Sequence, residues 1–306
     1  MFDFRYHLVS LAAVFIALAV GILLGAAISG KLGDAENALT KARVKSLSDQ
    51  LTQERNDSDI IERRSEAAED LLGQAYPALM ANRLEGKGFA VLFLGPADGD
   101  VRTAVERTLA DADAGSPVRL IALDTPVDPP ELDAALEGDE QLAHFAQEGD
   151  DFAALGEALG RDLIEEDGTP LWSTLSSSLI EERSGTTSTP VDGAIVVQTW
   201  HEPDSPGDAD EQSRTRATES LFEGLVRGLE STGLPVVGVQ TTSAEADLAI
   251  FREQGVSSVD DVDAVAGRLA LALLLQGGAE AGHYGVKDSA TSGIAPPVEP
   301  VTTTSG

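Results

Sequence analysis

One loop of this 306-residue chain gathers the side chains that most readily bind a metal ion. The segment TWHEPDSPGDADEQ, residues 199–212, supplies one imidazole and several carboxylates. One imidazole with oxygen donors suits a borderline or hard divalent ion and holds Cu(II) weakly. We therefore take His201, Glu202 and Asp204 as candidate metal ligands. The segment has neither calcium-loop spacing nor an HExxH pair, so a solvated acidic loop is the alternative.

Two further loops contain residues that could bind a ligand. GPADGD, residues 95–100, follows an apolar run at the place where a dinucleotide-binding fold has its phosphate loop. It matches neither GxGxxG nor GxxxxGK, and Asp98 and Asp100 would repel phosphate, so we predict a turn in which Asp100 caps the next helix. In GHYGVKD, residues 282–288, we predict a turn that packs Tyr284 against the domain.

Nothing in the chain marks an enzyme. It has no cysteine and no GxSxG elbow, and its four histidines are far apart in sequence. We therefore predict a protein without catalytic residues. Because catalytic triads assemble from distant residues, an enzyme with a site around Asp98 and His201 is the alternative.

Apolar runs that alternate with helical patterns predict the fold of the region after residue 86. Strands are expected at residues 88–95, 118–124, 192–200, 234–241 and, as a short edge strand, 256–259. Helices are expected at residues 101–112, in pieces between 129 and 183, and at 215–230, 244–254 and 262–276. This alternation predicts a mainly parallel, three-layer, Rossmann-like α/β domain with right-handed crossovers.

The first 30 residues predict a membrane-spanning helix. Residues 8–28 carry no charge, and about 20 apolar residues cross a bilayer as a helix. The run is longer than that of an ordinary signal peptide, so an uncleaved anchor is favoured over a cleaved leader. Small residues recur every four positions in the span, including a GxxxG at Gly21 and Gly25, which allows two helices to approach closely.

Residues 31–85 predict a coiled-coil stalk. Their apolar residues follow an imperfect heptad with one phase slip, and the surrounding residues are charged. Pairing through the span and the stalk would make a parallel homo-oligomer, whereas packing of this helix onto its own domain is the alternative. An acidic α/β domain at residues 86–287 and a Pro/Ser/Thr-rich disordered tail at residues 288–306 complete the expected organisation.

The charge distribution excludes nucleic acid as a partner. Residues 86–306 hold 12 basic and 40 acidic residues of a chain whose formal net charge is -31, and nucleic-acid binding is driven by cations. Arg5 precedes the span, while Lys31, Lys41, Arg43 and Lys45 follow it. These charges favour a cytoplasmic domain, but long domains are exported largely regardless of charge, so the side of the membrane stays open.

The opening RYHLVSLAAVFIALAVGILLG and the late GHYG resemble the actinobacterial copper-transport outer-membrane protein family known as MctB. The resemblance implies a cell-envelope protein whose domain lies outside the plasma membrane and which lowers intracellular copper. Cu(I) prefers sulfur ligands, and this chain has no Cys and two Met. We therefore expect weak Cu(II) contact or an indirect role through an envelope partner. An envelope scaffold with no direct metal role is the alternative.

Overall fold

The computed structural model describes residues 4–140, 142–146, 150–165, 170–186, 189–203, 207–244 and 248–298. Within these ranges, side chains are described for residues 10–26, for residue 41 and from residue 43 onward. The chain divides into two compact units, Met1–Ala68 and Glu69–Gly306.

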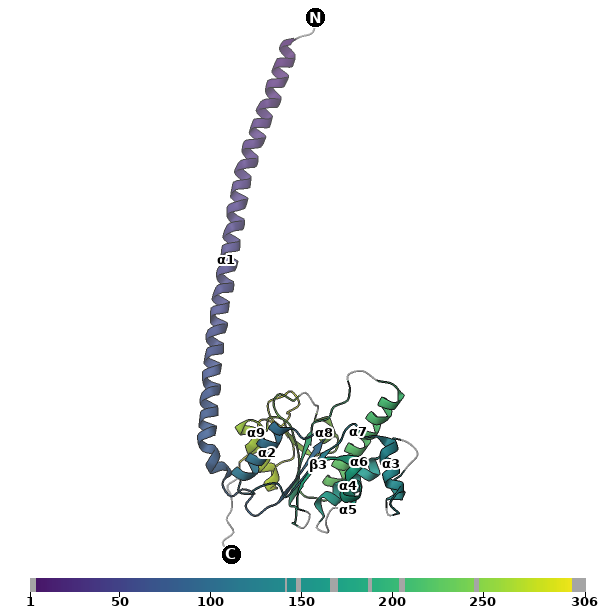
Figure 1. Ribbon diagram of the computed structural model, residues 1–306. Coiled ribbons are helices and arrows are strands. Elements are labelled where there is room, and N and C mark those ends of the chain that lie inside the picture. The colour runs from purple at the N-terminus through teal and green to yellow at the C-terminus, as the bar shows by residue number, and fades with distance from the viewer. Residues whose placement is uncertain are drawn as a thin grey trace. The chain divides into compact units, whose positions relative to one another are not determined.

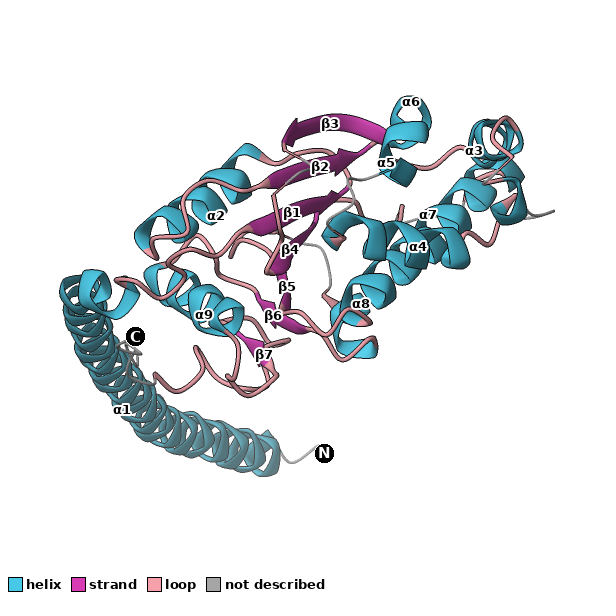
Figure 2. Cartoon of the chain, turned by 90° about the horizontal axis from the view of Figure 1, so that it is seen from below, coloured by secondary structure: helices cyan, strands magenta, loops and turns pink. Residues whose placement is uncertain are grey.

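The second unit is built on one seven-stranded sheet of order β3-β2-β1-β4-β5-β6-β7 (Figure 2). Its strands are β1 Phe89–Leu94, β2 Arg119–Leu123, β3 Ile180–Gly185, β4 Gly193–Gln198, β5 Val236–Val239, β6 Ser257–Val259 and β7 His283–Tyr284. All neighbouring strands pair in parallel except β2 and β3, which are antiparallel. A mainly parallel α/β sheet, as predicted, is therefore confirmed.

Helices cover both faces of the sheet because its central strands are apolar on both sides. Every residue of β1 is buried, and β1 pairs with β2 and β4 in register, with Val91 opposite Leu120 and Ile195. One core joins alternate residues of β1 to the helices α3, α4, α7 and α8, and the other joins the remaining residues to α2 and α9 (Figure 2). The helix bounds are α2 Gly99–Asp111, α3 Pro129–Glu137, α4 Ala153–Ile164, α5 Pro170–Thr174, α6 Ser176–Leu179, α7 Ala209–Glu230, α8 Ala249–Glu253 and α9 Val265–Gln276, with a short 3₁₀ helix at Ala143–Phe145.

Both ends of the sheet differ from the prediction. Residues 180–183, predicted as part of a helical region, begin β3, a charged edge strand with the sequence IEERSG whose side chains are largely exposed. Charged residues are typical of edge strands, but they conceal the period-2 apolar pattern that identifies a strand. At the other end, β6 is not the edge, because His283 and Tyr284 of the predicted turn add β7 beside it.

Helices α4 and α7 cross at very close range. A Cβ atom at Gly224 or Gly228 of α7 would collide with the backbone of Ala153 or Glu157 in α4, and one at Gly156 would collide with α7. The two helices each carry glycines four residues apart, which lets their backbones touch. The crossing fixes the position of α7, and the first turn of α7 lies beside the candidate metal loop.

The N-terminal helix α1, Phe4–Met80, is drawn in purple and blue in Figure 1. Its last turns belong to the second unit, where Tyr76 and Met80 are buried against α2 and α9. Within the first unit, the apolar side chains between residues 44 and 61 are exposed, and they were predicted to form the coiled-coil seam. No helix in the described part of the chain is both long enough and apolar enough to cross a membrane. The span and the coiled coil stay predictions.

Candidate functional site

The strand order reverses between β1 and β4, which is where ligands bind in most open parallel sheets. Here the two strand ends are tied together instead. The backbone N–H groups of Thr199 and Trp200 both donate to the Leu94 carbonyl oxygen, at 3.2 and 2.9 Å, and the Thr199 hydroxyl donates to Pro96 O at 2.9 Å. A Cβ atom at Gly95 would lie 2.7 Å from the Trp200 nitrogen. The two loops are therefore in direct backbone contact at the edge where a ligand usually binds.

A protein carboxylate occupies the place where a nucleotide phosphate would bind. Asp98 caps α2, and its Oδ1 accepts hydrogen bonds from the N–H groups of Asp100 and Val101, each at 2.9 Å. The prediction that Asp100 is the cap was wrong, because α2 begins at Gly99, two residues earlier than its apolar pattern indicates. An acidic cap also repels phosphate, so this helix end argues against a nucleotide site, as the sequence predicted.

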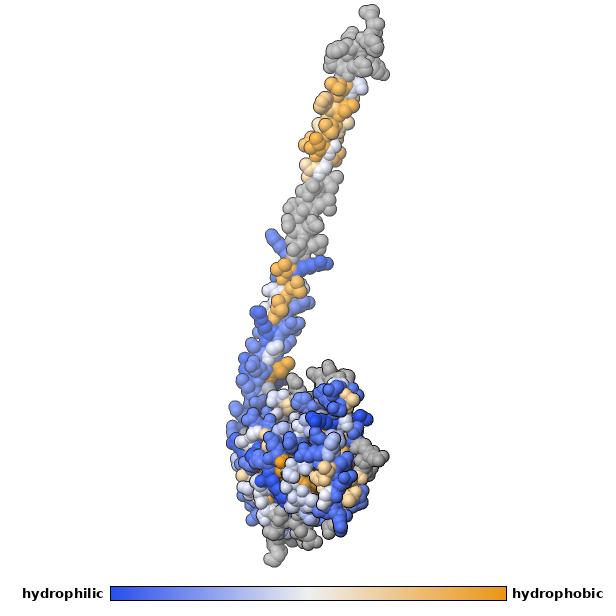
Figure 3. All heavy atoms as spheres, turned by 45° about the vertical axis from the view of Figure 1, so that its right-hand side comes forward, coloured by the Kyte–Doolittle hydropathy of each residue, from blue (hydrophilic) through white to orange (hydrophobic). Residues whose placement is uncertain are grey.

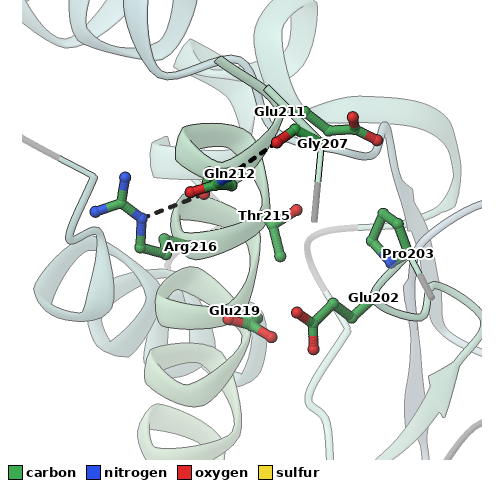
Figure 4. A pocket seen from close by; sticks show the side chains of 8 residues that line it. All are labelled: Glu202, Pro203, Gly207, Glu211, Gln212, Thr215, Arg216 and Glu219. Atoms are coloured by element: carbon green, nitrogen blue, oxygen red, sulfur yellow. Dashed lines mark hydrogen bonds between the residues drawn. The ribbon is translucent and has the colours of Figure 1, made fainter. Parts of the chain in front are cut away.

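His201 and Glu202 follow β4 on an exposed loop, whereas Asp204 lies outside the described residues. The loop borders a hollow of about 410 Å³ between α7 and α8. This hollow is lined by Gln198, Trp200, His201, Glu202, Glu219, Phe222, Glu223, Ala249, Ile250 and Glu253. Glu202 and Glu219 also line a second hollow, of about 270 Å³, at the start of α7 (Figure 4). We call the two hollows together the acidic groove.

The acidic groove concentrates negative charge. Figure 4 shows the carboxylates of Glu202 and Glu219 pointing toward each other across the smaller hollow, while Arg216 points away from it. Arg216 pairs instead with Asp150, at 3.1 Å, and no ion pair in the described part of the chain involves Glu202 or Glu219. Burial raises the pKa of Glu219, and the neighbouring charges of Glu202 and Glu223 raise it further. A cation entering the groove would relieve this repulsion.

The floor of the larger hollow adds a neutral acceptor and an aromatic wall. The Oε1 atom of Gln198 is buried without a hydrogen-bond partner, and Trp200 packs edge-on against Phe222 with ring centroids 5.8 Å apart. The groove thus offers carboxylate and amide oxygens beside one imidazole, a donor set for a borderline or hard cation. Among the described residues, no three His, Cys, Asp or Glu side chains converge closely enough to hold a metal ion. The metal-ligand role of His201, Glu202 and Asp204 stays a prediction.

The GHYG segment has a structural role. The imidazole Nδ1 of His283 lies 3.0 Å from the Ser258 hydroxyl oxygen, and Tyr284 is buried with its hydroxyl donating to Glu280 O at 2.9 Å. Burial lowers the pKa of His283, and the charge of Arg252 lowers it further. Sequence reasoning missed the buried carboxylates Asp260 and Asp261 beside this segment. The run VDDVD directly after a short strand was the available signal.

Fold and groove together define a class of protein: an open, mainly parallel α/β domain that follows a long N-terminal helix in the chain and has an acidic groove beside α7. The family model described as "Copper transport outer membrane protein, MctB" matches residues 1–295, and the chain belongs to this family. This confirms the resemblance carried by RYHLVSLAAVFIALAVGILLG and GHYG.

Two relatives extend the comparison over nearly the whole chain. The protein named copper transporter MctB in Mycobacterium tuberculosis (strain ATCC 25618 / H37Rv) is 26% identical over 326 residues, which cover 95% of this chain and 98% of the relative. The copper transporter MctB of Mycobacterium bovis has the same identity and coverage. The similarity therefore includes the N-terminal helix as well as the α/β domain.

Proposed function

We propose that this protein is a non-enzymatic, membrane-anchored cell-envelope protein that contributes to copper transport and copper homeostasis. The observation that carries the proposal is the family match over residues 1–295. The matched relatives are named copper transporters, and the match covers 98% of their length. The proposal therefore rests on similarity over the whole relative and not over one domain.

Membrane anchoring through residues 8–28 is part of the proposal. The large apolar side chains between Leu11 and Leu24 are exposed, each by about half or more of its surface (Figure 3, orange). So many contiguous apolar side chains are unfavourable in water, and a bilayer or a second helix would bury them. The family description names an outer membrane protein, which supports a domain on the extracytoplasmic side.

Copper contact in the acidic groove is the finer part of the proposal. Cu(II) accepts imidazole and carboxylate ligands, and the groove presents His201 and Glu202 beside the further carboxylates of Glu219, Glu223 and Glu253. The chain has no cysteine, so a thiolate site for Cu(I) is not available. We propose weak, exchangeable Cu(II) binding by His201, Glu202 and Asp204, which suits a protein that passes the ion onward.

A second candidate function is an envelope scaffold that forms oligomers and recruits a protein partner without touching metal. The exposed apolar positions Val44, Leu47, Leu51 and Ile61 of α1 favour it, because they form a surface that a second helix would cover. The scaffold requires a stable oligomer and a protein partner, whereas the copper role requires that the acidic groove bind copper.

Copper content of cells tests the proposed function. In the source organism, deletion of this protein should raise intracellular copper several-fold during growth in added copper, as measured by elemental mass spectrometry. The full chain should restore the lower level, and a His201→Ala chain should restore it only in part. A His144→Ala chain is the matched control, because His144 is exposed and far from the groove residues in sequence. Unchanged copper after deletion would overturn the copper role and leave the scaffold.

A further inference from the structure

Two adjacent carboxylates are buried at the carboxyl end of β6. Asp260 and Asp261 are each 1% exposed. Asp260 is well supplied with donors: its Oδ1 accepts from Val286 N at 2.8 Å, and its Oδ2 accepts from Lys287 N at 3.2 Å and from the Ser289 hydroxyl at 3.4 Å. Neither carboxylate oxygen of Asp261 accepts a hydrogen bond from another residue, and only the backbone N–H of Asp261 itself favours the ionised form. Burial without donors from other residues favours the protonated form of a carboxyl group.

The charged groups around Asp261 also favour its protonated form. Asp260 and Asp263 on the same loop are both acidic. The basic groups of the neighbouring segments donate to backbone oxygens, and the charge of Lys287 also interacts with those of Asp260 and Asp263. Arg268 of α9 donates to Asp263 O at 2.7 Å, and the Lys287 Nζ atom donates to Thr241 O at 3.0 Å and Ala244 O at 2.6 Å. Burial, and then the charges of Asp260 and Asp263, raise the pKa of Asp261 to about 6.

The backbone of α9 confines Asp261 on one side. A Cβ atom at Gly267 of α9 would lie 2.5 Å from its Oδ1, so the helix backbone closes one side of the carboxyl group. Asp260 is equally confined, since a Cβ atom at Gly285 would collide with it. Relief of the repulsion between two ionised side chains therefore requires movement of backbone.

The backbone that Asp260 holds is the segment 285–293, which we call the C-terminal strap. Besides the bonds to Asp260 and from Lys287, the strap is attached where Ser292 N donates to His283 O at 3.0 Å. The Ser292 hydroxyl in turn accepts from His283 N at 3.2 Å. The strap thus lies along β7, the edge strand of the sheet, and three of its residues, Val286, Lys287 and Ser289, bond to the carboxylate of Asp260 next to Asp261.

We propose that the protonated Asp261 holds the C-terminal strap closed on the sheet edge, and that ionisation of Asp261 as the pH rises loosens the strap. The proton passes to solvent, the new charge repels Asp260, and the loop that carries both residues shifts. That shift breaks the bonds from Val286, Lys287 and Ser289 to Asp260. The strap is then held next to β7 mainly by the two bonds between Ser292 and His283 and by the bonds of the Lys287 side chain. This device is independent of copper binding in the acidic groove.

The sign of the pH effect follows from the raised pKa. A carboxyl group whose pKa rises from 3.8 to about 6 in the closed state stabilises that state fully below pH 3.8 and loses the contribution as the pH passes 6. With those two values, the equilibrium constant for opening increases about tenfold between pH 5 and pH 7.5.

Hydrogen exchange of the full chain in detergent tests the proposal, read by mass spectrometry on peptides covering residues 283–292 at pH 5 and pH 7.5. After correction for the intrinsic pH dependence of exchange, the wild-type strap should open about tenfold more at pH 7.5. An Asp261→Asn strap should open equally at both pH values. An Asp288→Asn chain is the control, because Asp288 is an exposed acid of the same strap, and it should respond as the wild type does.

Two outcomes would overturn the proposal: a wild-type strap with no pH response, or an Asp261→Asn strap that keeps it. Exchange of α2 in the same samples reports whether the variant is folded. If Asp261→Asn does not fold, the Asp261 carboxyl carbon in the wild type is followed by NMR. Its midpoint should lie near pH 6, the pH above which strap opening stops increasing, and a midpoint near 4 would contradict the proposal.

Discussion

Two buried carboxylates in this domain differ in the hydrogen bonds that they receive. Asp162 accepts from the N–H groups of Leu171 and Trp172, at 3.0 and 3.4 Å, whereas Asp261 accepts from no other residue. Burial nevertheless raises the pKa of Asp162 to about 6, because desolvation outweighs the two backbone donors and the more distant charge of Arg119. Both residues make the folded state less stable when they ionise.

Asp162→Asn should remove a pH-dependent loss of stability. In the wild type, Asp162 costs stability as the pH rises from 3.8 to about 6. The stability of the variant relative to wild type should therefore improve by about 1–3 kcal/mol between pH 4 and pH 7.5, as measured by urea unfolding. Glu137→Gln, an exposed acid, is the control and should show no such change. A difference in stability between Asp162→Asn and wild type that does not change with pH would contradict the raised pKa of Asp162.

Residue types and spacing predicted where polar side chains lie along the chain. They predicted less well which other residues surround those side chains. His201 and Glu202 were expected in a loop after a strand, and they lie on the exposed loop that follows β4, while their role as metal ligands stays a prediction. Asp100 was wrongly predicted to cap α2. The helix begins at Gly99, two residues before its apolar pattern, so the pattern did not reveal where it starts. The environment of Asp260 and Asp261 was not predictable, because it depends on a strap that is distant in sequence.

At the scale of elements, the α4–α7 crossing has the tightest backbone contacts of the helical layer. Gly224 and Gly228 lie against α4, and Gly156 and Gly160 lie against α7, so four positions tolerate no side chain. The crossing is invisible in the sequence, because GxxxG spacing also occurs where a helix faces open solvent. The buried strands were easier to predict from the sequence. The apolar runs predicted the bounds of β1 and β4 to within two residues.

Gly224→Ala should destabilise the domain by about 2–3 kcal/mol, because the new methyl group collides with the Ala153 backbone in a core that cannot expand locally. Gly73→Ala is the matched control. Its Cβ atom would meet nothing within 4 Å, so the same substitution should stabilise α1 by about 0.5–1 kcal/mol. Thermal unfolding of both variants measures the difference. Equal effects would show that the crossing is looser than the structure indicates.

At the scale of the whole molecule, α1 links a proposed membrane anchor to the α/β domain in one continuous helix, Phe4–Met80. Where it meets the second unit, Arg83 donates to the Gln276 side chain and Lys87 donates to the Gln276 backbone oxygen, each at 2.8 Å. These bonds and the burial of Met80 fix the end of α1 on α9. The last turns of α1, which belong to the second unit, therefore pack on the domain, and the coiled-coil stalk before them stays a prediction.

Replacing Leu47 and Leu51 together by Asn should dissociate the proposed homo-oligomer. Both side chains are more than half exposed in the single chain, and polar residues at two successive seam positions weaken a coiled coil. Sedimentation of the full chain in detergent should show a smaller species for the double variant. Ser58→Asn, a polar exchange in the same helix, should leave the wild-type species intact. A monomeric wild type would remove the stalk from the proposed function.

A copper titration of the full chain in detergent, followed by Trp200 fluorescence, tests the proposed function most directly. Trp200 lines the acidic groove and the other tryptophan, Trp172, is fully buried, so bound Cu(II) should quench the emission of Trp200. We predict saturable quenching that calcium does not reverse, that His201→Ala weakens several-fold and that His144→Ala leaves unchanged. Quenching that calcium reverses, and that is equally strong in His201→Ala, would contradict direct copper binding in the groove.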